Sequence, residues 1–172
     1  VLLRERGITM PVVVLNADAD SFDQMIANRL EPEIYSFRSL ADFADAVSHA
    51  GETRYPVHIK LDTGMHRLGF MEGEIGRLCE VLPTLPAVKV ASVFSHLNCA
   101  DMPEEDAYTR EQIARYDRMS AAVAASLPYS VIRHTANSAA IERFPEARFD
   151  MCRLGLGLYG FGFEHNAALR PV

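Results

Sequence analysis

Short apolar runs alternate with longer amphipathic segments along the whole chain. The runs have the length and the β-branched or aromatic content of strands, and they lie at residues 11–15, 33–37, 57–62, 88–97, 131–136 and 149–161. The segments between them carry helical spacing or helix-start signals, and they cover 21–30, with Ser21 as the predicted cap, 39–50, 72–82, 104–127 and 138–143. Strand and helix in alternation predict an α/β fold with a parallel sheet covered by helices.

Chain length distinguishes between the two common folds of this class. An eight-unit (β/α) barrel of about 250 residues averages about 31 residues per unit, so 172 residues correspond to about 5.5 units, close to the six predicted strands. A doubly wound sheet that binds a dinucleotide would carry G-x-G-x-x-G in its first turn. The match that starts at Gly155 lies inside the predicted strand 149–161. We therefore predict one partial (β/α)8 TIM-type barrel domain over residues 1–172, with two units missing.

Composition narrows the classes of function. A net charge of -6 without a dense Lys/Arg run argues against a nucleic-acid partner. No apolar run reaches the roughly 18 residues of a membrane span, and three widely spaced cysteines favour a reducing compartment, so we expect a cytoplasmic protein. The chain begins VLLRERGI, without a methionine or a signal peptide, and we expect it to be a piece of a longer protein.

The most informative stretch is HIKLDTGMHRLGF, residues 58–70. It begins as a strand whose polar positions are His58, Lys60 and Asp62, and it continues into a loop that contains Arg67 and Gly69. Glycines next to charged groups at the end of a strand allow the backbone to approach a ligand closely. This combination predicts a binding site.

Other polar residues follow the carboxyl ends of the later strands, where barrel enzymes keep their sites. They are His96 and Asn98, then Asn137 and Ser138, and finally Arg153, Gly155 and Gly157. Alternation in the last predicted strand places Arg153, both glycines and Tyr159 on one face, which leaves room for a planar ligand. Backbone N–H groups there, with Ser138 at a helix start, suit an anion. The residues predict a flat, phosphorylated cofactor or substrate.

Four motifs in one order, KLDTGMHRLGF, FSHLNCAD, HTANSAA and MCRLGLGLYG, resemble the signatures of alanine racemase, a fold-type III pyridoxal-phosphate enzyme. The resemblance implies an eight-stranded barrel followed by a β-rich domain, of which this chain would be barrel strands three to eight. It also implies pyridoxal 5'-phosphate as the cofactor and a homodimer as the intact enzyme. The segment LEPEIYSF further resembles the form that is fused to a Mur ligase.

On the substrate side, Arg67 matches the arginine that contacts the substrate carboxylate and the phenolic oxygen of the cofactor. A guanidinium suits this role because its fork presents paired donors to a carboxylate. Lys60 matches a lysine that is carbamylated in many relatives, and the alternative for Lys60 is a barrel lysine paired with Asp62. Asp62 itself is expected to bind loop amides.

On the cofactor side, Arg153 matches the arginine that faces the pyridine nitrogen, and His96 matches the histidine that supports this arginine. Arginine stays protonated, so it would donate a hydrogen bond to the ring nitrogen without giving up its proton. The residues that match the phosphate cradle, together with an adjacent cofactor contact, are Ser138, Gly155, Leu156 and Asn137. His96 and Cys99 lack a second ligand pair, so no metal site is predicted.

The resemblance also implies two absences. Racemisation needs one base on each face of the substrate α-carbon, and neither the Schiff-base lysine nor the opposing tyrosine of the family has a counterpart in these 172 residues. We expect a segment of an enzyme that interconverts L- and D-alanine for peptidoglycan synthesis, inactive by itself. The alternatives are a racemase for serine or another small amino acid, a pyridoxal-phosphate-binding barrel without catalysis, and a barrel fragment without a ligand.

Overall fold

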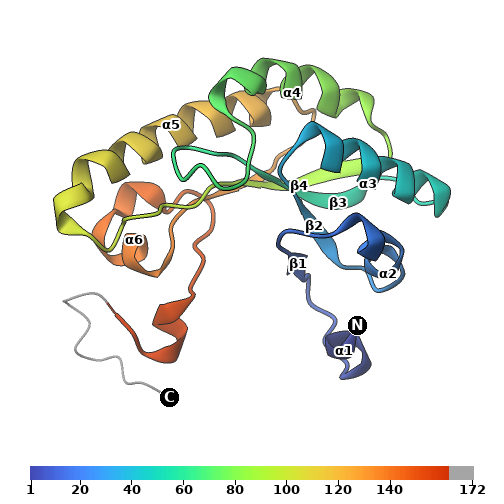
Figure 1. Ribbon diagram of the computed structural model, residues 1–172, viewed down its shortest axis with the longest axis horizontal. Coiled ribbons are helices and arrows are strands. Elements are labelled where there is room, and N and C mark those ends of the chain that lie inside the picture. The colour runs from blue at the N-terminus through green and yellow to red at the C-terminus, as the bar shows by residue number, and fades with distance from the viewer. Residues whose placement is uncertain (163–172) are drawn as a thin grey trace.

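The computed structural model describes residues 1–162, in which a curved parallel sheet is covered by helices on its convex side (Figure 1). The five strands are neighbours in chain order, namely β1 (Val13–Val14), β2 (Glu31–Ile34), β3 (Tyr55–Lys60), β4 (Val88–Phe94) and β5 (Ile132–His134). Every neighbouring pair is parallel. The predicted partial (β/α) barrel is confirmed.

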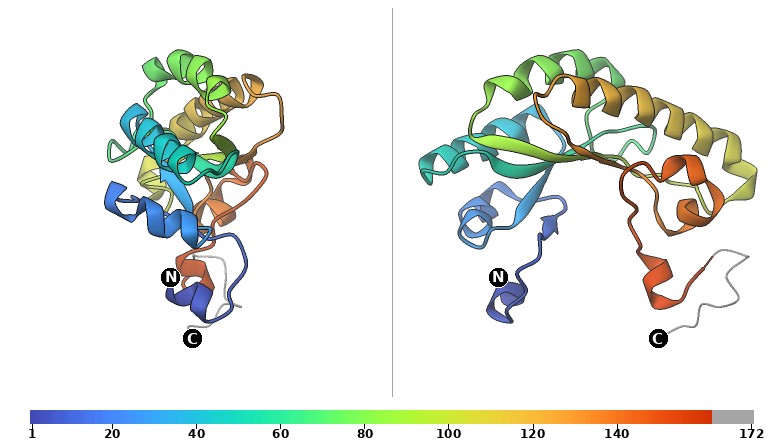
Figure 2. Two further views of the ribbon diagram at one scale, coloured as in Figure 1. Left: turned by 90° about the vertical axis from the view of Figure 1, so that its right-hand side faces the viewer. Right: turned by 180° about the vertical axis from the view of Figure 1, so that it is seen from behind.

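Four helices connect successive strands, namely α2 (Phe22–Ala27), α3 (Phe37–His49), α4 (Ile75–Val81) and α5 (Asp106–Ala125), while α1 (Leu2–Glu5) precedes β1 and α6 (Ser138–Arg143) follows β5. Seen from behind in Figure 2, sheet and helices form an arch, with α1 near one foot and the short turn at Leu156–Tyr159 near the other. Within residues 1–162, no helix is both long and apolar enough to cross a membrane.

Side-chain capping explains where α3 begins. The Ser36 hydroxyl accepts a hydrogen bond from Ser39 N, and the Ser39 hydroxyl accepts one from Ser36 N, both at 3.1 Å. This reciprocal pair satisfies two amide groups that would otherwise have no partner at the helix start. The first predicted helix differs, because Ser21 ends a 3-10 turn and makes no capping bond, and α2 starts at Phe22.

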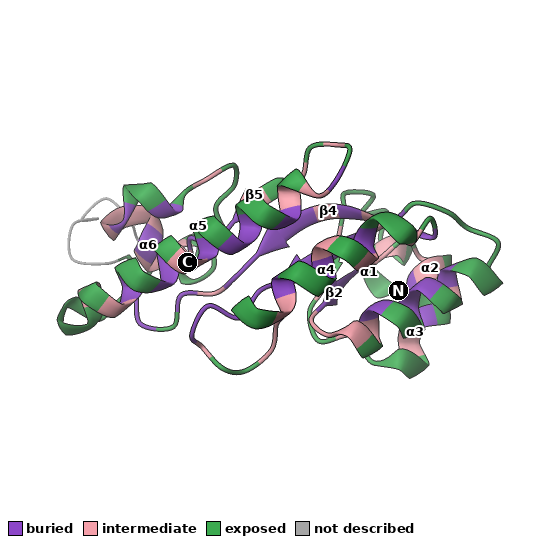
Figure 3. Cartoon of the chain, turned by 90° about the horizontal axis from the view of Figure 1, so that it is seen from above, coloured by how far each residue is buried: buried purple, intermediate pink, exposed green. Residues whose placement is uncertain are grey.

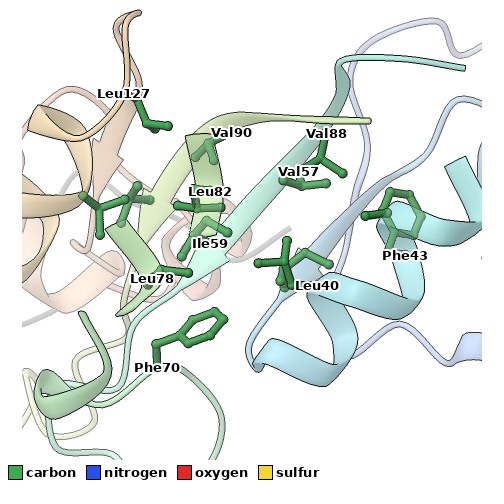
Figure 4. Packing of buried hydrophobic residues seen from close by; sticks show 14 of the residues in the cluster. Leu40, Phe43, Val57, Ile59, Phe70, Leu78, Leu82, Val88, Val90 and Leu127 are labelled. Carbon is green, nitrogen blue, oxygen red and sulfur yellow. The ribbon is translucent and has the colours of Figure 1, made fainter. Parts of the chain in front are cut away.

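The main hydrophobic core lies between the convex face of the sheet and the helices. Figure 4 shows Leu40 and Phe43 of α3 with Val57 and Ile59 of β3, and these four side chains are almost fully buried. Viewed from above in Figure 3, the helices are exposed on their outer side and buried toward the sheet. The opposite, concave face carries buried polar side chains of β2 to β5 together with the ring of Phe94, and the polar ones are Glu33, His58, Lys60, Ser92 and His134.

An irregularity in β4 changes which of its side chains face the core. The register between β3 and β4 shifts between Val57 and His58, so that Val57 pairs with Val90 while His58 pairs with Ser92. Strict alternation would place Val90 and Val93 on opposite faces, yet both belong to the core behind the sheet. Such a bulge locally re-aims the strand, and here it turns Ser92 toward the concave face.

The predicted strand at 149–161 is wrong. Only two backbone hydrogen bonds tie this segment to the region of β5, from Asp150 N to Arg133 O and from Arg153 N to Ala136 O. Gly155 then leaves the extended region of backbone conformation, and Leu156–Tyr159 form a 3-10 turn. The predicted single face of Arg153, two glycines and Tyr159 therefore does not exist.

The other predicted elements exist, although several are shorter. The helix at Ser138–Arg143 has the predicted bounds, whereas β4 ends at Phe94 rather than at residue 97. His96 consequently lies in the loop that follows the strand. Two α-helices are bounded by 3-10 turns that contain a proline, Leu82–Thr84 after α4 and Pro103–Glu105 before α5. Proline lacks the N–H that the interior of an α-helix requires, so it lies at the ends of these helices.

Phe70 is the core residue that closes the loop after β3, and its loss should destabilise the fold. Its side chain is fully buried and meets the Phe37 ring edge to face at 5.1 Å. Its backbone bonds both Lys60 and Asp62 at 2.9 Å. We expect Phe70→Ala to lower the free energy of unfolding by about 3–5 kcal/mol, measured by urea denaturation. Met71→Ala, at the exposed neighbouring position, should change it by less than about 0.5 kcal/mol, and equal losses would contradict this packing.

Candidate ligand-binding site

A cavity of about 520 Å³ opens at the carboxyl ends of β3, β4 and β5. The eight residues predicted from the sequence all line it, namely Lys60, Arg67, His96, Asn137, Ser138, Arg153, Gly155 and Leu156. They come from five separate segments of the chain, and the curvature of the parallel sheet brings these segments to one rim. The lining also includes Leu15, Phe94 and Asp101, which sequence reasoning missed.

Arg153 is held by a dense set of acceptors on the inner side of the sheet. Its Nη1 donates to His134 Nδ1 at 2.9 Å, and its Nη2 donates to Ser95 O at 2.7 Å and Thr135 O at 3.2 Å. The guanidinium also lies over the Phe94 ring, at 5.4 Å from its centroid. The predicted supporter, His96, approaches Nη2 only at 3.5 Å. His134 is therefore the closer partner.

His96 lines the cavity, His134 is buried next to Arg153, and both are in the neutral form. Burial, with the nearby charge of Arg153, lowers the pKa of His134 to about 3, and the same two causes lower the pKa of His96 to about 4. A neutral imidazole can accept a hydrogen bond from Arg153, which a protonated one cannot. His134 opens the motif HTANSAA, so its place at a strand end was a signal that the sequence contained.

Lys60 pairs with a residue that sequence reasoning did not single out. Its ammonium nitrogen is 3.1 Å from Glu33 Oε1, and both side chains are buried. The second carboxylate oxygen of Glu33 accepts a 2.7 Å bond from Asn16 N. The predicted alternative, a Lys60–Asp62 pair, is wrong, because Asp62 is occupied by the loop that follows it.

Asp62 organises the loop that presents Arg67. Its Oδ1 accepts hydrogen bonds from Gly64 N at 2.9 Å and His66 N at 3.0 Å, as expected for a carboxylate that binds loop amides. Gly69 adopts a φ of +132°, and a Cβ there would lie 2.6 Å from Asp62 N. The glycine thus closes the loop against its own strand, and our expectation that it makes room for a ligand is wrong. Arg67 lies on this loop, exposed at the cavity rim.

Ser138 brings two backbone amides to one point. Its hydroxyl accepts hydrogen bonds from Gly155 N and Gly157 N, each at 3.0 Å. The predicted pair of amides was Gly155 and Leu156, and the 3-10 turn instead aims the N–H of Gly157 at this hydroxyl. Asn137 has a structural task, because its Oδ1 caps α6 through Ala140 N and its Nδ2 donates to Leu97 O.

The charges around the cavity suit an anionic ligand. Lys60, Arg67 and Arg153 all line it and lower the pKa of His96 together with burial. Arginine is well matched to planar carboxylate and phosphate groups. No group of three potential metal ligands occurs within residues 1–162. The arrangement can bind a phosphate or carboxylate and hold hydrogen-bond donors toward a planar ring.

Comparison with known proteins gives matches along almost the whole chain. The profile of the family described as alanine racemase, N-terminal domain, matches residues 1–162. The alanine racemase of Symbiobacterium thermophilum is 37% identical over 93% of this chain and 42% of its own length, and that of Desulfovibrio desulfuricans is 37% identical over 99% and 47%. The crystallised alanine racemase of Clostridium difficile superposes with a TM-score of 0.88 at 30% identity, over 99% of this chain and 46% of that one. The chain thus spans about half the length of the curated relatives it matches.

The lowered pKa of His134 predicts that acid weakens the fold. In the unfolded chain a histidine titrates near 6.5, whereas His134 in the fold titrates near 3. Between these values only the unfolded chain binds the proton, so stability falls as the pH is lowered below about 6.5, by up to about 1.4 kcal/mol per pH unit for this residue.

Urea denaturation from pH 7 to pH 4.5 measures this slope. We expect His134→Gln to reduce the slope, because the titrating group is removed. Thr135→Val, a buried neighbour that does not titrate, should leave the slope unchanged. An identical slope in the native protein and in His134→Gln would show that His134 is not held neutral.

Proposed function

Since the chain belongs to the alanine racemase family through its N-terminal domain, we propose that it supplies the barrel wall of a pyridoxal-phosphate-dependent enzyme that interconverts L- and D-alanine. The observation that carries this proposal is the meeting of eight predicted residues from five segments around one cavity. The shared cationic character of Lys60, Arg67 and Arg153 supports a ligand with both a phosphate and a carboxylate.

The donor set fits the proposed cofactor. The amides of Gly155 and Gly157 converge beside the start of α6, where both bond Ser138 Oγ, and a phosphate that took the place of this contact would find the two backbone N–H donors and the hydroxyl together. The cavity volume of about 520 Å³ lies in the usual range for cofactor sites. When bound, pyridoxal phosphate withdraws the electrons left at the substrate α-carbon after loss of its proton.

Arg153 is proposed to face the ring nitrogen of the cofactor. Two carbonyl oxygens and His134 hold its guanidinium in one orientation, and a guanidinium donates hydrogen bonds without transferring its proton at neutral pH. It therefore orients the ring and leaves the nitrogen largely unprotonated. This limits electron withdrawal, which favours return of a proton over side reactions.

Arg67 is proposed to bind the substrate carboxylate. It stands at the cavity rim on a loop that Asp62 and Phe70 fasten to β3. The fork of its guanidinium can bind both oxygens of a carboxylate. An anchored loop keeps this cation in place while leaving its side chain exposed for exchange of substrate.

The two proton-transferring bases of the family, a lysine and a tyrosine, have no counterpart in the motifs of this chain. We therefore propose that residues 1–172 bind and orient, and that racemisation requires the complete enzyme. In that enzyme the product D-alanine would serve peptidoglycan synthesis in the cytoplasm, and the second base would come from the partner subunit of a homodimer.

Replacement of Arg67 tests the function and this assignment together. In the complete enzyme, formation of D-alanine from L-alanine should fall at least about 100-fold for Arg67→Ala, because a charge-assisted contact worth about 3 kcal/mol is lost. The absorbance spectrum of the bound cofactor should stay largely unchanged.

Arg67→Lys is the matched control, and it should recover only part of the activity because an ammonium lacks the fork. Loss of cofactor binding in Arg67→Ala would show that Arg67 belongs to the cofactor side. Turnover of serine in preference to alanine by the unaltered enzyme would overturn the choice of substrate.

Lys60 provides a second test, on the carbamylation that the resemblance implies. Carbamylation joins a neutral amine to CO2 with release of one proton and creates an anion. Glu33 already places a carboxylate 3.1 Å from the Lys60 nitrogen, so a carbamate would set two anions side by side. This contact supports the unmodified ammonium, and we propose that form.

The complete enzyme, equilibrated with ¹³C-bicarbonate, should therefore show no protein carbamate signal in its ¹³C NMR spectrum. Lys60→Met is the reference for assigning any signal. A carbamate resonance that disappears in Lys60→Met would establish the modification and contradict the ammonium form.

A further inference from the structure

A continuous line of buried and partly buried hydrogen bonds crosses the concave face of the sheet. It runs from Arg153 Nη1 to His134 Nδ1 at 2.9 Å and from His134 Nε2 to Ser92 Oγ at 3.0 Å. It continues from Ser92 Oγ to His58 Nδ1 at 2.7 Å and from His58 Nε2 to Glu31 Oε2 at 2.8 Å. Four strands contribute one residue each, so the line spans β2 to β5 and ends under the guanidinium.

The chemistry of the two ends fixes the direction of every hydrogen bond in the line. A guanidinium has no acceptor, so Arg153 donates and His134 Nδ1 carries the lone pair. Neutral His134 must then carry its proton on Nε2, and it donates to Ser92. The single hydroxyl hydrogen of Ser92 is then left for its other partner, His58 Nδ1, and His58 Nε2 donates to Glu31.

A carboxylate accepts without donating, so the other end requires the same order. The assignment made from Arg153 therefore agrees with the assignment made from Glu31. Reversal of the link between Ser92 and His58 would leave the buried hydroxyl hydrogen of Ser92 without an acceptor in the line. A single serine hydroxyl serves both imidazoles because it accepts from one and donates to the other.

We propose that Glu31, His58 and Ser92 are positioning residues that fix the tautomer of His134 and thereby hold Arg153 in place. Within residues 1–162, no carboxylate lies within ion-pairing distance of Arg153. The line instead connects this buried cation to the carboxylate of Glu31 through four hydrogen bonds. Hydrogen bonds in such a chain polarise and strengthen one another.

The bulge in β4 supports this assignment independently. It places Ser92 opposite His58 in the ladder and turns the serine to the concave face, where it lies 2% exposed. The stacked ring of Phe94, 5.1 Å from His134 and almost parallel to it, covers one face of the imidazole and limits its rotation. We name the line of hydrogen bonds from Arg153 to Glu31 the relay. The relay thus depends on the bulge in β4 and on the ring of Phe94 as well as on its own polar atoms.

The consequence for the cofactor rests on the proposed function, whereas the relay itself does not. If Arg153 faces the cofactor ring, then residues that never touch the cofactor decide how firmly that donor is oriented. A weakened relay should lower both cofactor affinity and turnover, while the exposed Arg67 and its contact with the substrate carboxylate are left alone.

The tautomers are tested by ¹⁵N NMR of the complete enzyme with labelled histidine. We expect His134 and His58 both to carry one proton, on Nε2, at neutral pH. In Ser92→Ala, the ¹⁵N signal of His58 Nδ1 should shift because this nitrogen loses its hydrogen-bond donor, whereas Ser92→Thr, which keeps a hydroxyl, should match the native spectrum. A proton on Nδ1 of either ring, or an unshifted His58 Nδ1 signal in Ser92→Ala, would overturn the relay.

A second variant acts from the other end of the line. Glu31→Ala removes the final acceptor, and it should release the tautomer of His58 and remain testable if Ser92→Ala does not fold. Glu52→Ala, at an exposed position near the same strand ends, is the matched control and should leave both rings unchanged. A response of His58 to the control as large as to Glu31→Ala would contradict the relay.

The positioning role is tested by titration with pyridoxal phosphate and by turnover. We expect Ser92→Ala to weaken cofactor binding and to lower kcat by about two- to tenfold, the range for loss of one neutral hydrogen bond, with little change in KM for alanine and recovery in Ser92→Thr. Native cofactor affinity and kcat in Ser92→Ala would overturn this role. An unaltered enzyme that binds no pyridoxal phosphate would instead refute the proposed function, and the NMR result would still decide the relay.

Discussion

Charged groups inside the curve of this sheet must find partners, because a charge without a partner in a protein interior is strongly destabilising. Two carboxylates on β2 meet this requirement. Glu33 pairs with Lys60 and also acts electrostatically on Arg153, and Glu31 is joined to Arg153 by hydrogen bonds through two histidines and a serine. The concave face therefore carries a network of hydrogen bonds. This network orients Lys60 and Arg153, the two cations that it presents to the cavity.

The two faces of the sheet have different roles. Apolar side chains such as Val57 and Ile59 pack against the helices and supply the hydrophobic stabilisation, while the polar side chains between them supply position and charge. Barrel interiors are more often filled with branched aliphatic residues. Here polar side chains fill part of the interior and connect it to the proposed site. A substitution of Glu31, which does not line the cavity, would therefore act on Arg153 through the hydrogen bonds of the relay.

Much of the architecture could be predicted from the sequence. Hydrophobic periodicity and helix-start signals located every helix but α1 and five of the six expected strands, and motif order collected eight of the residues that line the cavity. The segment 149–161 was mistaken for a strand because its alternation of apolar residues is real, whereas strand formation needs a ladder of partners, and only two backbone bonds form there. Gly69 was misinterpreted for a similar reason, since its close neighbour is its own backbone and not a ligand.

The sequence by itself determined the order of elements, the apolar face of each, and the types of charged residue at the strand ends, because these depend on local periodicity and composition. Only the tertiary structure decided which charges meet. The partner of Lys60 is Glu33, on the neighbouring strand and 27 positions away, and the closest side-chain partner of Arg153 is His134 rather than His96. Strand register and a bulge in β4 set these pairings, and a one-residue shift of register exchanges the two faces of a strand, which no local pattern reveals.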